Sequence, residues 1–256
     1  MTTGEMADGM ELMARGIVIK ETAVGENDKI LTLFLEGYGK VQAWARGSRK
    51  VSGKLLAVSS LFTYAKYSIV KRKDTGIITG GEVIETFFDL RTDIVKLALG
   101  NYLLELAGAS VEENAAEDEI LRLLLNTLHV LTKRDLPPKF VKAVFELRIL
   151  SLSGYLPELH SCVSCGRESG LTRFDCVAGG LLCGSCESDA PAETIYPVSA
   201  GSVDAMRYIV SCRPEKLFSF TLSPASLDQL AEVAEGFARV MLERRFKTLG
   251  FYHSIV

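Results

Sequence analysis

Two Cys-x-x-Cys pairs constrain the fold of this chain more than any other feature of its sequence. Cys162 and Cys165 form the first pair, and 17 residues separate it from the second pair, Cys183 and Cys186. Separations of roughly 15–20 residues are typical of sites in which four thiolates bind one zinc ion. Two residues between cysteines allow one tight turn to direct both sulfurs at one ion, and the second pair completes the tetrahedron. The spacing therefore predicts one structural zinc ion per chain.

Other interpretations of the quartet stay open at this point. Two disulfides, or four unrelated buried thiols, would also account for the cysteines. His160 is a further candidate ligand, because it precedes Cys162 by two residues. Gly166 and Gly184 each follow a cysteine, and we expect both to adopt the positive φ that glycine reaches most easily.

The N-terminal residues are not typical of a protein exported to an oxidising compartment. Glu5, Asp8 and Glu11 precede the first basic residue, whereas a secretory signal begins with positive charge. No apolar run reaches the ~18 residues that span a membrane. We therefore expect a cytoplasmic protein with no membrane partner, in which reduced thiols favour a metal over disulfides.

Charge is distributed unevenly along the chain, although the whole sequence has a net charge of only −3. Residues 15–73 contain twelve basic and four acidic side chains, a net charge of +8. A basic segment joined to an acidic remainder indicates that one part of the chain meets a polyanion. A solvated charged surface without a partner is the alternative interpretation.

The basic segment also has the pattern of β-structure. Alternating or continuous apolar residues between turn signals predict five strands, at 16–22, 29–35, 40–46, 61–70 and 76–87. Five short strands within about 75 residues are typical of the OB-fold, a small five-stranded barrel. We predict a flexible tail over residues 1–14 and an OB-fold nucleic-acid-binding domain over residues 15–90.

From about residue 91 the apolar residues recur with a helical period. The pattern predicts helices that include residues 97–107, 119–132, 138–153, 197–210 and 224–247, and Gly250 is a stop signal for the last of them. The predicted fold class is therefore α+β and multidomain. An α-helical domain over residues 91–256 follows the barrel, and a loop-rich zinc module at 158–190 is inserted in it.

Candidate DNA-binding residues lie in the barrel. Lysine and arginine neutralise phosphates, and exposed aromatic rings stack on bases. Strand alternation sends half of all strand residues inward, so the alternative interpretation of Trp44 is a residue of the barrel core rather than a ring that stacks on bases. The candidates are Lys29, Tyr38, Lys40, Trp44, Arg46, Arg49, Lys50, Lys54, Lys66, Lys71, Arg72 and Lys73.

Signatures of catalysis are missing from the sequence. No GxxxxGK[ST] or GxGxxG motif is present, and only three histidines occur. A zinc-dependent nucleotide hydrolase is disfavoured because four cysteine ligands leave no open coordination position. We therefore expect neither an enzyme nor a small-molecule substrate.

Two groups of short runs, one in the barrel and one around the cysteines, resemble the bacterial RecO family of DNA repair proteins. In the barrel these are Gly16–Val18, Gly25–Lys29, Leu31–Phe34, Gly39–Lys40 and Ala45–Lys50. Around the cysteines they are Leu152–Gly166 and Gly179–Cys186. The similarity extends from about residue 15 to about residue 251.

The resemblance implies an OB-fold, a helical domain and an embedded four-cysteine zinc module. It also implies a nucleoid-associated recombination mediator that binds single- and double-stranded DNA and anneals complementary strands. Such a protein works with RecR and RecF to load RecA onto strands coated by single-strand-binding protein (SSB). An adaptor whose basic barrel docks an acidic protein is the alternative. The SSB tail would bind in the helical domain, for which Arg239, Arg244, Arg245 and Lys247 are candidates, with a solvated helix end as the other interpretation.

Overall fold

The computed structural model describes residue 9 and residues 11–72, 75–113 and 115–256. The chain forms two compact units that divide between Thr132 and Lys133. The first unit therefore includes two helices in addition to the barrel. The domain division predicted at residue 90 stays a prediction.

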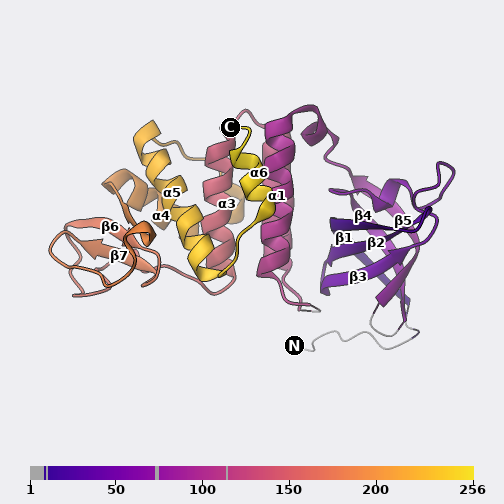
Figure 1. Ribbon diagram of the computed structural model, residues 1–256, viewed down its shortest axis with the longest axis horizontal. Helices are drawn as coiled ribbons and strands as arrows, with labels where there is room; N and C mark the ends of the chain where they lie inside the picture. Colours follow the sequence, from indigo (N-terminus) through magenta and orange to yellow (C-terminus); the bar gives the residue numbers. More distant parts are fainter. Residues whose placement is uncertain (1–8, 10, 73–74, 114) are drawn as a thin grey trace. The chain divides into compact units, whose positions relative to one another are not determined.

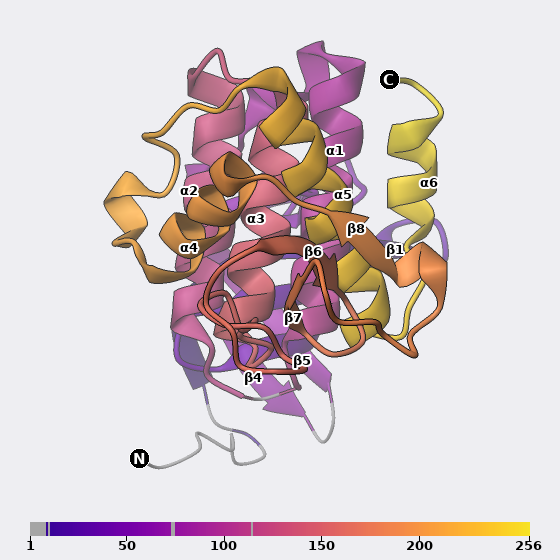
Figure 2. The same cartoon turned by 90° about the vertical axis from the view of Figure 1, so that its left-hand side faces the viewer.

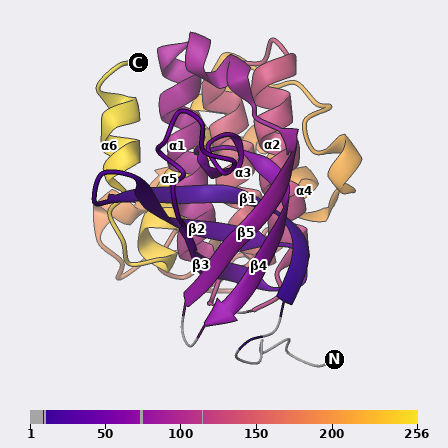
Figure 3. The same ribbon diagram turned by 90° about the vertical axis from the view of Figure 1, so that its right-hand side faces the viewer.

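Five strands of the first unit close into a barrel (Figures 1 and 3). They are β1 (Glu11–Val24), β2 (Asp28–Leu35), β3 (Gly39–Ala45), β4 (Tyr64–Arg72) and β5 (Thr75–Glu85). The order around the barrel is β1-β2-β3-β5-β4, and the neighbours are antiparallel except for the parallel pair β3 and β5. This topology is that of an OB-fold, and it confirms the predicted fold class.

Alternate residues of the strands fill the interior of the barrel. Leu31, Leu33 and Leu35 of β2 are fully buried, and so are Ala43 and Ala45 of β3. Because side chains of a strand alternate between its two faces, the residues between them point outward. The barrel is therefore held by an apolar core formed from all five strands.

The barrel begins earlier than the sequence pattern suggests. Leu12 and Ala14 lie in β1 and belong to the barrel core, with 3% and 8% of their surfaces exposed. The prediction of a flexible tail is therefore wrong for residues 11–14. Residues 1–8 and 10, the rest of the predicted tail, lie outside the described residues.

Two helices complete the first unit, namely α1 (Ile94–Ser110) and α2 (Asp118–Lys133). The carboxylate of Asp93 caps α1 by accepting hydrogen bonds from the first turn. A Cβ atom at Gly108 would lie 3.2 Å from Ile19 Cδ1, so α1 packs closely against β1. The segment between the helices contacts the start of β3, where a Cβ at Gly39 would lie 1.9 Å from the carbonyl oxygen of Ala115.

Four helices and a small sheet form the second unit (Figure 2). The helices are α3 (Pro138–Leu152), α4 (Ala200–Ser211), α5 (Pro224–Met241) and α6 (Lys247–His253), and α3 packs against both α4 and α5. The predicted helix over 224–247 is wrong in its last turn, because Glu243 has a φ of 47° and separates α5 from α6. Gly250 lies inside α6 and stops no helix.

The cysteine module has more regular structure than the expected loops. Strands β6 (Leu171–Asp175), β7 (Gly180–Cys183) and β8 (Ile195–Pro197) form an antiparallel sheet in the order β7-β6-β8.

Short 3₁₀ turns occupy 57–59, 88–92, 192–194 and 214–216. Within the described residues, no helix has the length and apolar character that crossing a membrane requires.

A charged group lies inside the second unit between α3 and α5. Lys142 Nζ lies 2.9 Å from Glu146 Oε1 and 2.6 Å from Glu235 Oε2, and the Lys142 side chain is only 3% exposed. Burial lowers the pKa of Lys142, but the two carboxylates outweigh burial and raise the pKa above its ordinary value. Pairing keeps these buried charges tolerable.

Candidate metal centre and nucleic-acid interface

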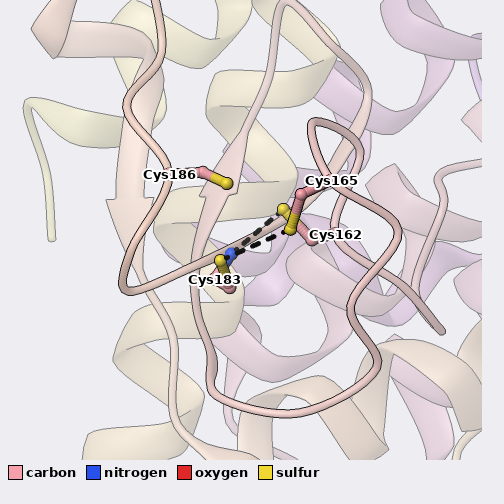
Figure 4. A group of neighbouring side chains, drawn as sticks. All are labelled: Cys162, Cys165, Cys183 and Cys186. Carbon is pink, nitrogen blue, oxygen red and sulfur yellow. Dashed lines mark hydrogen bonds between the residues drawn. The ribbon is translucent and has the colours of Figure 1, made fainter.

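The four cysteines of the quartet lie together in the second unit (Figure 4). The sulfur atoms of Cys162, Cys165, Cys183 and Cys186 are all within 4.8 Å of one another. Zinc–sulfur bonds of about 2.3 Å place the sulfurs of a tetrahedral site about 3.8 Å apart, and the Cys165 and Cys183 sulfurs are 3.8 Å apart. The thiols are free rather than joined in disulfides. The arrangement is therefore one that a single metal ion fits.

Local turns bring each pair of sulfurs together. In the first turn, the N–H of Gly166 donates to the carbonyl of Cys162 at 2.8 Å, and Gly166 has a φ of +73°. In the second turn, the N–H of Cys186 donates to the carbonyl of Cys183 at 3.4 Å. The expectation of a positive φ is confirmed for Gly166 and wrong for Gly184, which is not among the positive-φ glycines.

The surroundings of the four sulfurs stabilise the thiolate form of some cysteines more than that of others. Burial raises the pKa of Cys162, but backbone N–H groups of Cys183, Cys165 and Ser164 outweigh it and lower that pKa to about 6. The Ser164 hydroxyl lowers the pKa of Cys186, whereas the sulfurs of Cys165 and Cys183 outweigh it and raise that pKa to about 12. Four thiolates at this spacing therefore need a cation to be stable together.

Two residues near the quartet differ from what sequence reasoning indicates. The cluster found among the described residues does not include His160, which is exposed and whose N–H donates to Glu158 Oε1 at 2.7 Å. Arg173 was not a candidate, yet its Nη2 donates to the carbonyl oxygens of Cys183, at 3.2 Å, and of Cys186. No motif marks Arg173, because only the pairing of β6 with β7 brings it to the second cysteine pair.

Two of the predicted DNA-binding lysines are engaged inside the first unit. Lys29 Nζ donates to Glu21 Oε2 at 2.8 Å and to the carbonyl of Ser59 at 3.2 Å. Lys40 Nζ donates to the carbonyl oxygens of Gly108 and Val111, each at 3.1 Å, at the C-terminal end of α1. The structure therefore does not bring Lys29 and Lys40 to a free basic surface.

Four other candidates lie on the loop that follows β3. Arg46, Arg49, Lys50 and Lys54 are all exposed. Within the part of the chain that the structure describes, no acidic side chain pairs with any of the four. The guanidinium of Arg49 does donate to the carbonyl of Gly25, at 2.8 Å. The loop thus presents four cations on a short stretch of backbone.

Trp44 lies on the outer face of the barrel rather than in its core. Its neighbours Ala43 and Ala45 are buried inside, whereas Trp44 itself is half-buried. Arg46, two residues further along, is exposed in the turn that follows β3. Trp44 thus lies on the outer face near the end of β3, two residues before the first cation of the loop.

The remaining candidates are spread over a different part of the barrel. Tyr38 is half-buried and packs against the barrel core, and it also lines a surface groove of about 540 Å³ together with Lys66. Lys66 and Arg72 are exposed on β4, and Lys71 is half-exposed there. Lys73 lies outside the described residues. The basic residues therefore form two groups, one on the loop after β3 and one along β4, rather than one continuous patch.

The candidates for binding the SSB tail lie near the end of the second unit. Arg239 donates to the hydroxyl of Tyr196 at 3.2 Å and lines a groove of about 380 Å³ between α3, α5 and α6. Arg244, Arg245 and Lys247 are exposed where α5 gives way to α6. Of these four residues, Arg239 is the one that lines this groove.

Comparison with known proteins places this architecture in a family. The family model described as Recombination protein O N terminal matches residues 10–87, and Recombination protein O C terminal matches residues 91–250. The DNA repair protein RecO of Acetivibrio thermocellus is 35% identical over 95% of this chain and 97% of its own length. The protein of the same name from Caldicellulosiruptor bescii is 31% identical over 95% of this chain and 98% of its own length. That from Dehalococcoides mccartyi is 30% identical over 96% of this chain and 96% of its own length. The chain therefore belongs to the RecO family of DNA repair proteins.

Proposed function

We propose that this chain is a DNA-binding recombination mediator. It binds and anneals DNA strands at the nucleoid and, together with RecR and RecF, helps to load RecA onto single strands coated by SSB. It does so as a binding protein, without catalysing a reaction. Family membership supports the role in DNA repair, and the individual steps are part of the proposal.

The single observation that carries the proposal is the loop after β3. Four exposed cations on this loop follow the half-buried Trp44 in the sequence. Cations bind phosphates and release counterions, which gives affinity for any sequence. A ring at the edge of such a track adds stacking of about 1–3 kcal/mol per base. Two strands bound at one positive surface repel each other less, so annealing proceeds without a nucleotide cofactor.

We propose further that the cysteine quartet binds one Zn²⁺ ion with a structural role. The four cysteines support zinc, because four thiolate ligands arranged as a tetrahedron around one ion are typical of closed structural zinc sites. Cys162 and Cys183 are buried and Cys165 is exposed, and four cysteine ligands would leave no open coordination position for a substrate. The ion would supply positive charge that allows all four thiols to be thiolates at neutral pH.

A charge-reversal experiment tests the DNA-binding surface. The triple variant Arg46→Glu/Lys50→Glu/Lys54→Glu is compared with Arg122→Glu/Arg213→Glu/Lys216→Glu, which changes as many exposed charges elsewhere. Binding of fluorescent single-stranded DNA is measured across salt concentrations. We expect the loop variant to lose about 2 in the slope of log affinity against log salt, since each phosphate contact contributes about 0.7.

The control variant should keep the slope of the wild-type protein. Equal slopes for the loop variant and the wild type would rule out this surface. A wild-type protein that binds an acidic protein partner but shows no salt-dependent affinity for DNA would instead favour the adaptor function.

A further inference from the structure

The basic loop after β3 has an apolar residue at its tip. Val51 lies between Lys50 and Lys54 in the sequence, and 94% of its surface is exposed. Among the residues that the structure describes, no other large apolar side chain is as exposed as Val51. Single exposed apolar residues are common on proteins, so the inference depends on what surrounds this one.

The loop that carries Val51 is held in place by its own hydrogen bonds. Three successive turns are closed by backbone hydrogen bonds, from Lys50 to Gly47 at 3.2 Å, from Gly53 to Lys50 at 2.8 Å and from Leu56 to Gly53 at 3.0 Å. A Cβ atom at Gly53 would lie 2.3 Å from the carbonyl oxygen of Gly47, so the backbone crosses itself closely there. The tip is therefore part of a built structure rather than an open loop.

The base of the loop is fixed to the barrel on both sides. The N–H of Gly47 donates to Asp28 Oδ1 at 2.8 Å, and the N–H of Arg49 donates to the carbonyl of Asn27 at 3.0 Å. On the far side, Leu55 enters the barrel core. Because these contacts already order the loop, binding through its tip costs little additional conformational entropy.

The chemistry of the tip selects one kind of partner. Cations before and after Val51 attract phosphates, but an isopropyl group gains nothing from a phosphate and is best placed against an apolar surface. In DNA the largest such surface is the face of a base. Proteins insert apolar side chains between bases while cations bind the flanking backbone, and the insertion costs a few kcal/mol of unstacking per step. That cost is least where a base pair already has an open face.

We propose that Val51 is an apolar wedge that contacts the terminal base pair at a junction between single- and double-stranded DNA. The cations of the loop hold the phosphates of the two strands beside it. The inference rests on the proposed DNA-binding function and deepens it by naming the DNA structure that the loop recognises. It assigns to the loop a preference for such junctions, which charge alone does not give.

Three fluorescent DNAs with the same number of phosphates test this preference. They are a single strand, a blunt duplex and a duplex with a single-stranded arm, and affinity is measured with the full chain. We expect the wild-type protein to bind the junction about fivefold to tenfold more tightly than the duplex, as burial of a valine side chain allows. Val51→Ser should reduce this ratio to less than twofold, and Val51→Leu should keep it.

A fluorescent base analogue gives a second readout of the wedge. With 2-aminopurine in the last base pair of the junction, wild-type binding should increase its fluorescence, and Val51→Ser should not. Val177→Ser is the matched control, because it makes the same change at an exposed valine of the second unit.

The outcomes separate this inference from the function on which it rests. If Val51→Ser keeps both the junction preference and the fluorescence increase, the wedge is overturned and DNA binding stands. If the wild-type protein binds none of the three DNAs, the proposed function itself fails.

Discussion

The barrel and the cysteine module are stabilised in different ways. The barrel buries apolar side chains from all five of its strands. The module has only a small apolar cluster around the cysteines, in which Leu182 is buried together with Cys162 and Cys183, and its Phe174 packs on Phe237 of α5. Segments with so little core usually need a metal or a disulfide to fold. The comparison teaches that one chain can depend on side-chain volume in one region and on ligand chemistry in another.

Removing one cysteine ligand of the zinc ion should have the largest effect on stability, and this effect should be confined to the cysteine module. We expect Cys183→Ser to lose the metal, because three thiolates cannot close the tetrahedral site. Structural zinc contributes an apparent binding free energy on the order of 10 kcal/mol at neutral pH. Elemental analysis should show a metal-free protein, and limited proteolysis should cleave within residues 158–190 while the barrel stays intact.

Cys212→Ser is the matched control, since Cys212 is a half-buried cysteine outside the quartet. It should keep one zinc ion per chain and the wild-type digestion pattern. A Cys183→Ser protein that retains the metal and resists proteolysis would show that the quartet does not hold the module together.

Creating a cavity in the barrel should give the opposite pattern. Leu33 is fully buried in β2, and a Leu→Ala change in a core costs about 2–5 kcal/mol, because contacts and apolar burial are lost together. We expect Leu33→Ala to lower the free energy of unfolding in urea by that amount and to leave the zinc content unchanged. Loss of zinc from this variant would show that the two regions are coupled.

Features that depend on local spacing were predictable from the sequence. The cysteine quartet follows from two short turns, each built by neighbouring residues such as Gly166. The five barrel strands follow from the alternation that buries Ala43 and Ala45 and turns Trp44 outward. In both cases the pattern and its cause lie within a few residues of each other.

Features that depend on distant partners were not predictable. Lys40 was a DNA-binding candidate, but its amine caps the end of α1, 68 and 71 residues further along the chain. Lys29 likewise bonds Ser59, 30 residues away. Position in a basic segment does not distinguish a lysine used inside the unit from one at the surface. The division of the candidates between the loop and β4 has the same origin, because strand pairing decides where each cation lies.

Lys40 and Lys50 offer a comparison within the barrel unit itself. Lys40→Met removes two hydrogen bonds to carbonyls at a helix C-terminus, where a cation is favourable, and should lower the free energy of unfolding by about 1–2 kcal/mol. Its salt slope for DNA should equal that of the wild type. Lys50→Met should show the reverse, with unchanged stability and a slope smaller by about 0.7. Parallel urea unfolding and DNA titrations check both variants, and a reduced slope for Lys40→Met would return Lys40 to the DNA-binding surface.

The smallest effect is expected at Ser48, a buried residue of the loop after β3. Ser48 is fully buried, and its hydroxyl has no hydrogen-bond partner among the described residues. Ser202 in the second unit is also fully buried, but its hydroxyl donates to Ser199 at 2.9 Å and contacts Gln229 at 3.1 Å. Removing a bonded hydroxyl costs about 1 kcal/mol, whereas removing an unpaired one costs little or stabilises. Urea unfolding should therefore show Ser48→Ala within about 0.5 kcal/mol of the wild type and Ser202→Ala about 1 kcal/mol below it. A larger loss at Ser48 would mean that its hydroxyl has a partner that helps to hold the loop.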